Sequence, residues 1–113
     1  MCSQSDLKKV LDAIVLVYKN NYADNVVSVI LYGSYARGDN TSESDIDVVA
    51  IVKGNRAELQ AKLDDIWDKA AEISLEYDVV LSPTVIPQDE FEENKDVIPY
   101  YRNIDTEGVR IVA

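Results

Sequence analysis

Apolar residues near the N-terminus recur every three or four positions, the spacing that places them on one face of a helix. Lysines and aspartates occupy the opposite face, and Ser5 precedes the pattern as a suitable N-cap. The pattern predicts an amphipathic helix over about residues 5–20, ending at Asn20-Asn21. Its apolar positions are Leu7, Val10, Leu11, Ile14, Val15 and Tyr18.

Two apolar runs of a different kind follow and indicate strands. Val26 to Tyr32 is almost continuously apolar, is rich in β-branched residues and ends at Gly33, as expected of a buried strand. Asp45 to Val52 alternates, so that Asp45 and Asp47 share one face and apolar residues share the other.

The next segment predicts a helix followed by a strand. Asn55 is a suitable N-cap with Glu58 at the third helical position. A third strand is predicted over Leu75 to Val85, where β-branched residues alternate, and Pro87 closes it. The apolar stripe of the helix is formed by Leu59, Leu63, Ile66, Trp67, Ala70 and Ile73.

The C-terminal part predicts two short helices and a short strand. Pro87 to Lys95 has the composition of an acidic helix, and Pro99 fits the first turn of another one. Gly108 suits the position after that helix, and Val109 to Val112 is expected to form an edge strand. The order of elements favours an α/β (α+β) fold, in which helices cover mainly one face of a mixed sheet of about four strands.

Composition narrows the chemistry that this chain can perform. Its 113 residues suit one domain, 1–113, and the chain lacks a long apolar run or a leader pattern, so we expect a cytoplasmic protein. Cys2, the single cysteine, is expected to be inert, and no histidine is present. Zinc sites of the Cys/His type and Ser-His catalysis are therefore excluded, and any metal must have oxygen ligands, which favours Mg²⁺ or Mn²⁺.

The net charge of -10 bears on partners. Such a field repels a long nucleic acid and an anionic membrane, and it attracts a basic protein. A nucleoside triphosphate remains compatible because bound metal ions bring positive charge.

One motif joins two signals that are weak separately. Gly33-Ser34 is followed, after ten residues, by Asp45-Ile46-Asp47. Two aspartates on one strand face have Cα atoms roughly 7 Å apart, so that their side chains can converge on a pair of metal ions. Gly33-Ser34 can form an anion-binding turn, to which Arg37 adds a guanidinium suited to phosphate. Separately, each piece is more often an ordinary turn or a solvated pair, and Arg37 could instead face solvent beside Asp39.

With these residues the chain resembles the DNA polymerase beta-like nucleotidyltransferase superfamily, and within it the minimal nucleotidyltransferases (MNT), antitoxins that accompany HEPN-domain toxins. The closing segment from Tyr101 to Val109 is also similar to the tail of that subgroup. The resemblance implies a third carboxylate on a later strand, which Asp78 matches, with Glu76 as the rival. A carboxylate within an otherwise apolar strand needs a partner, and a metal ion would provide one. Tyr35 occupies a position that is often basic in relatives.

The resemblance implies transfer of AMP from Mg-bound ATP to a tyrosine hydroxyl of a HEPN ribonuclease toxin. Gly33, Ser34 and Arg37 would bind the nucleotide. The two motif carboxylates and Asp78 would bind two Mg²⁺ ions, or Mn²⁺, and carry out catalysis.

Two alternatives remain, an aminoglycoside-type nucleotidyltransferase and an antitoxin that acts by occlusion without catalysis. We expect the acceptor surface to come from another protein or from self-association, because the chain has no room for an acceptor domain. Trp67, Tyr77, Tyr100 and Tyr101 are expected in the core or at an interface rather than as base-stacking platforms.

Overall fold

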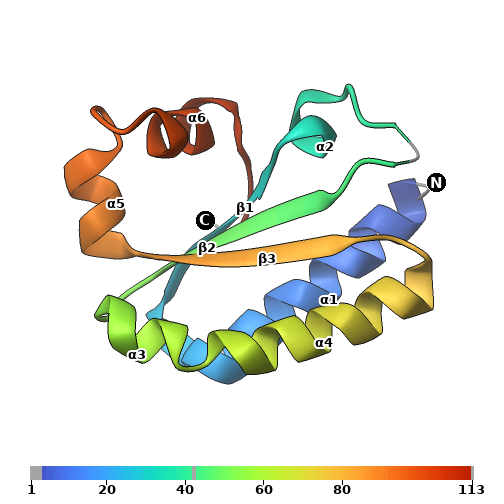
Figure 1. The fold of residues 1–113 in the computed structure, drawn as a ribbon, viewed down its shortest axis with the longest axis horizontal. Helices are drawn as coiled ribbons and strands as arrows, with labels where there is room; N and C mark the ends of the chain where they lie inside the picture. Colours follow the sequence, from blue (N-terminus) through green and yellow to red (C-terminus); the bar gives the residue numbers. More distant parts are fainter. Residues whose placement is uncertain (1–3, 42, 113) are drawn as a thin grey trace.

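The computed structural model of the chain describes residues 4–41 and 43–112. Its centre is a four-stranded sheet of order β3-β2-β1-β4 (Figure 1). β1 pairs antiparallel with β2 and with β4, whereas β2 pairs parallel with β3, so the sheet is mixed as predicted. The strands are β1 (Val26–Tyr32), β2 (Ile46–Val52), β3 (Leu81–Pro87) and β4 (Val109–Val112).

Helices lie on both faces of this sheet, with the two long ones together on one face (Figure 1). α1 (Gln4–Tyr22) and α4 (Leu63–Tyr77) bury their apolar residues there against Val48 and Ala50 of β2. The shorter α5 (Gln88–Asn94) and α6 (Pro99–Glu107) cover the other face. A second apolar cluster lies beneath them and contains Ile30, Val49, Ile51, Ile86, Phe91 and Ile104.

The first helix differs from its prediction at both ends. Ser5 lies inside α1, which begins by Gln4, so its cap falls outside the described residues, as does Cys2. At the other end α1 continues to Tyr22, which is buried and donates a hydrogen bond to the Leu59 carbonyl. The burial of Tyr22 explains why the helix passes through the asparagines, and α1 is followed by the short η1 (Ala23–Asn25).

The predicted second helix is divided in two. α3 (Arg56–Gln60) begins at the predicted cap, where Asn55 Oδ1 accepts a hydrogen bond from the Glu58 N–H at 2.9 Å. A turn then separates it from α4. In α4 the stripe is confirmed for Ile66 and Ala70, whereas Trp67 is 45% exposed and was wrongly assigned to the stripe.

The boundary between α4 and β3 is the largest departure from prediction. The segment 75–80 is not a strand, because α4 runs to Tyr77 and β3 begins only at Leu81. Ser74 joins the two elements: its hydroxyl donates to the Ala70 carbonyl at 2.8 Å and accepts from the Leu81 N–H at 3.1 Å. The β-branched Val79 and Val80 lie outside both elements, and the predicted strand starts late because residues 75–77, which are not β-branched, continue the helix.

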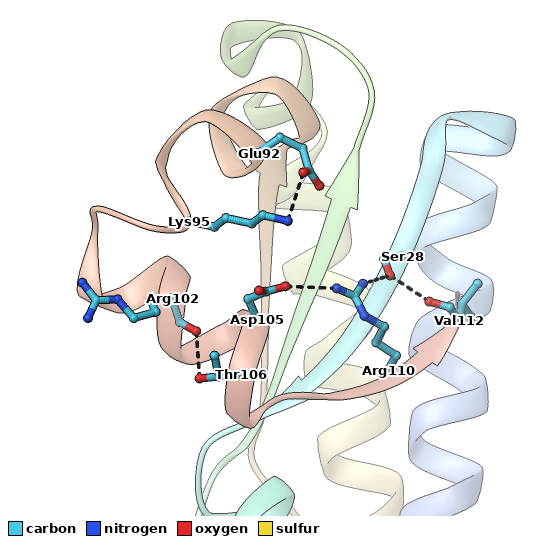
Figure 2. Close-up of polar contacts among 8 residues, drawn as sticks. All are labelled: Ser28, Glu92, Lys95, Arg102, Asp105, Thr106, Arg110 and Val112. Atoms are coloured by element: carbon cyan, nitrogen blue, oxygen red, sulfur yellow. Dashed lines mark hydrogen bonds and ion pairs between the residues drawn. The ribbon is translucent and has the colours of Figure 1, made fainter.

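The C-terminal elements agree with their predictions. α5, α6 with Pro99 in its first turn, and edge strand β4 are all present. Figure 2 shows how β4 is fastened: Arg110 donates to Ser28 Oγ at 2.8 Å and pairs with Asp105 at 3.3 Å, and Ser28 donates to the Val112 carbonyl. These contacts tie the end of the chain to the middle of the sheet. Among the described helices, none has the length and apolarity required to cross a membrane.

Candidate active site

The antiparallel pairing of β1 with β2 unites the two halves of the motif. Tyr32, the last residue of β1, pairs with Asp47 of β2, which brings Gly33 to the carboxylate. A Cβ atom added to Gly33 would lie 2.6 Å from Asp47 Oδ2, closer than real contacts allow. Gly33 also has a φ of 76°, which side chains rarely adopt. Glycine is required here both by space and by backbone conformation.

Directly after Gly33 the chain forms α2 (Ser34–Arg37), a single turn of helix. The Ala36 and Arg37 N–H groups both donate to the Gly33 carbonyl at 3.1 Å. Arg37 is exposed, and its Nε pairs with Asp39 Oδ2 at 3.3 Å, which is the alternative arrangement that the sequence left open. An exposed pair of this kind contributes little stability, so it does not prevent Arg37 from binding a phosphate.

The two motif carboxylates lie at the start of β2 in different surroundings. Asp45 is exposed just before the strand, whereas Asp47 is half-buried within it. Burial raises the pKa of the Asp47 carboxyl, and the nearby negative charge of Asp45 raises it further. In the loop that precedes Asp45, the Thr41 N–H donates a hydrogen bond to Ser44 Oγ at 2.8 Å.

This pair fits a divalent cation. Two adjacent carboxylates repel each other, and a cation between them removes the repulsion. Mg²⁺ is commonly held by one or two carboxylates, with substrate phosphates and water completing its ligands. Within residues 4–41 and 43–112, however, no group of three or more Asp, Glu, His or Cys residues could hold a metal ion.

Asp78 does not lie on a strand, and its predicted placement there is wrong. It is the C-cap of α4, with a left-handed φ of 53°, and its side chain is exposed. Aspartate is among the residues that adopt this conformation most readily, which explains its position at a helix end. Glu76, its rival, belongs to the last turn of the same helix. In the part of the chain that the structure describes, three carboxylates are thus not assembled, and the catalytic role of Asp78 stays a prediction.

Three hydroxyl residues near Asp47 were missed by the sequence analysis. Ser82 of β3 pairs with Asp47 in parallel register, and Thr84 lies two residues further on. Tyr100 of α6 packs edge-on against Tyr32, with ring centroids 5.9 Å apart. Burial raises the pKa of Tyr100, as do Tyr32 and Asp47, while a hydrogen bond with Thr84 lowers it. The register of β3 could have indicated Ser82 and Thr84, but it required the correct start of that strand, and no local signal places Tyr100 of α6 beside them.

Comparison with known proteins identifies the family. The model of the nucleotidyltransferase domain matches residues 9–112. The chain belongs to the nucleotidyltransferase family. A candidate protein adenylyltransferase of Methanocaldococcus jannaschii, MJ0604, is 31% identical over 101 residues, which cover 89% of this chain and 93% of that protein. A second one from the same organism, MJ0141, is 45% identical over 62 residues, or 55% of this chain and 61% of the relative.

Solved structures with the same fold confirm the architecture. A mutant of the toxin-antitoxin complex MntA-HpeT with two aspartate-to-glutamate substitutions superposes with a TM-score of 0.56 at 13% identity, covering 90% of this chain and 72% of that one. A toxin-antitoxin structure with AMP-PNP gives a TM-score of 0.53 at 13% identity, with 88% and 71% covered. At this identity the similarity establishes the nucleotidyltransferase fold, as the sequence predicted.

Proposed function

We propose that this nucleotidyltransferase transfers AMP from ATP to a hydroxyl group of a partner protein, most specifically a tyrosine of a HEPN-type ribonuclease toxin, and thereby acts as its antitoxin. The observation that carries the proposal is the contact between Gly33 and Asp47, which builds one site from both halves of the motif. The relatives described as protein adenylyltransferases and the fold shared with toxin-antitoxin structures support it.

The proposed reaction is an in-line displacement at phosphorus. The acceptor oxygen forms a bond to the α-phosphorus of ATP, the bond to the bridging oxygen of pyrophosphate breaks, and pyrophosphate leaves. The acceptor proton passes to solvent. Mg²⁺ held by Asp45 and Asp47 would supply positive charge opposite the phosphates and the leaving group, so the chain's own contribution is positioning and electrostatics.

The chain's own residues divide this work between two sides of the site. Asp45 and Asp47 bind the divalent cations at the start of β2. On the other side, Gly33 and Ser34 let the backbone approach the triphosphate, and Arg37 leaves Asp39 to bind a β- or γ-phosphate. This assignment explains why the turn and the carboxylates must touch.

The partner would dock on the outer side of α4. Trp67, Leu75 and Val80 are 45%, 85% and 56% exposed. They line an apolar groove of about 400 Å³. Exposed apolar surface that contains a tryptophan is typical of a protein interface. α4 carries five acidic residues and one lysine. The helix beside the groove is therefore negatively charged, which complements a basic toxin.

The proposal is tested by incubating the protein with labelled ATP, Mg²⁺ and the toxin encoded beside it. Label should move to the toxin and silence its ribonuclease activity, and Asp45→Asn and Asp47→Asn should each abolish both effects. Toxin inhibition that survives in both variants without label transfer would establish occlusion instead. Transfer to an aminoglycoside in place of the toxin would establish the small-molecule alternative.

A further inference from the structure

The strand register shows where a third carboxylate would have to lie. Ile46 and Leu81 pair with each other and are both buried on the side of α1 and α4. Asp47 and Ser82, the next pair, therefore point to the opposite face, and neighbouring strands place such partners about 5 Å apart. A carboxylate at residue 82 would lie beside Asp47, but this chain has a serine there.

Asp78 is held away from that position by two hydrogen bonds that link the residues after it to Ser74 before it. Val79 N–H donates to the Ser74 carbonyl at 3.0 Å, and Leu81 N–H donates to Ser74 Oγ. Asp78 itself has the left-handed conformation of a helix C-cap, with a φ of 53°. Asp78 thus belongs to the end of α4, four residues before the position that neighbours Asp47.

Beside Ser82, the other residues on this side of the site, Thr84 and Tyr100, also carry hydroxyl groups. Thr84 follows on the same face of β3, and its backbone is held by Tyr18, whose hydroxyl donates to the Thr84 carbonyl at 2.8 Å. Tyr100 of α6 adds a hydroxyl group near this side and packs on Tyr32, the strand partner of Asp47. These side chains carry no charge at neutral pH.

We propose that Asp45 and Asp47 are the only carboxylates among the described residues that hold the divalent cation. Ser82, with Thr84 and Tyr100, then forms a neutral third side in the place of a third carboxylate. This arrangement rests on the proposed function, and it adds no further negative charge beside an incoming triphosphate in a chain of net charge -10.

Metal binding tests this assignment without any AMP transfer. Mn²⁺ is titrated into the protein, and free Mn²⁺ is followed by electron paramagnetic resonance. Asp78→Asn keeps a residue that tolerates the left-handed conformation and should leave the Mn²⁺ affinity unchanged, whereas Asp45→Asn and Asp47→Asn should each weaken it. Ser82→Asp should strengthen Mn²⁺ binding, roughly ten-fold, because it adds a charged ligand.

Ser82→Asn is the control for Ser82→Asp, since it has a similar volume without the charge and should not strengthen binding. Weaker Mn²⁺ binding in Asp78→Asn, comparable to that in Asp47→Asn, would overturn the proposal, and so would unchanged binding in a folded Ser82→Asp variant. Should Ser82→Asp fail to fold, the Asp78→Asn comparison still decides. Normal metal binding without label transfer to the toxin would count against the proposed function alone.

Discussion

Gly33 lies against the carboxylate of Asp47, so closely that a Cβ atom at Gly33 would come within 2.6 Å of Asp47 Oδ2. The two residues are separated by a whole loop in the sequence and meet because Tyr32 and Asp47 are paired across β1 and β2. The spacing of the motif thus has a physical meaning. It is the length of chain that leaves β1, forms one helical turn and returns to begin β2 beside it.

The first prediction concerns this contact. Gly33→Ala should cost about 1–3 kcal/mol of stability through backbone strain. It should also reduce AMP transfer at least a hundred-fold, because the new methyl group displaces the Asp47 carboxylate. Thermal denaturation and the label-transfer assay measure both effects.

Gly38→Ala is the matched control, since Gly38 has a similar φ of 82° but nothing lies within 4 Å of an added Cβ. It should lose stability to a similar extent and retain most of its activity. Equal activity losses in the two variants would show that strain in the loop, rather than the contact with Asp47, is responsible.

The second prediction is that the charged Asp47 carboxylate destabilises the folded protein at neutral pH. Because burial and Asp45 raise its pKa above the ordinary value of 3.8, the folded protein binds this proton more tightly than the unfolded chain does. The protonated Asp47 carboxyl therefore contributes to the free energy of unfolding at low pH. This contribution is lost as the pH rises from 3.8 through the raised pKa. Asp47→Asn should therefore raise the melting temperature at pH 7, by about 3 °C, while abolishing activity.

The effect of Asp47 on stability can be checked by measuring the melting temperatures of the wild type and of Asp47→Asn as a function of pH. The gain from Asp47→Asn should shrink as the pH falls toward 3.8, where the wild-type carboxyl is protonated. A variant that is less stable than the wild type at pH 7 would contradict the assigned electrostatics.

The third prediction concerns Tyr18, which is fully buried and whose hydroxyl both donates to the Thr84 carbonyl and accepts from the Thr84 N–H at 3.1 Å. Burial raises the pKa of Tyr18, so the hydroxyl stays protonated. Tyr18→Phe should cost about 1–3 kcal/mol, because it leaves buried backbone groups without their partner. Denaturant unfolding measures the loss. Tyr77→Phe, which removes a hydroxyl at the end of α4, should leave the midpoint unchanged.

The fourth prediction concerns the apolar groove on α4. Trp67→Ala should weaken toxin binding at least ten-fold, because the indole is the largest exposed apolar group there. Calorimetric titration of the purified toxin gives the affinity. Val97→Ala removes apolar surface near α5 and α6, on the other face of the sheet, and should bind normally. Unchanged affinity in Trp67→Ala would place the interface elsewhere.

The sequence determined the elements whose signals are local. The alternation of acidic and apolar residues established strand β2 with Asp47 in it, although Asp45, predicted as its first residue, lies just before Ile46. The Asn55 cap and the proline at the start of α6 were predicted because capping and backbone restrictions act over a few residues. The motif likewise determined the family, which the comparisons confirm.

Only the tertiary structure decided which distant side chains share the site. Val79 and Val80 favour a strand locally, yet α4 continues to Tyr77, Ser74 hydrogen-bonds across the junction to Leu81, and Asp78 is left at the helix end. The register of β3 makes Ser82 the neighbour of Asp47, and the packing of α6 places Tyr100 against Tyr32 of β1. Strand register and cross-sheet packing are set by contacts between residues far apart in the chain, so local sequence signals do not contain them.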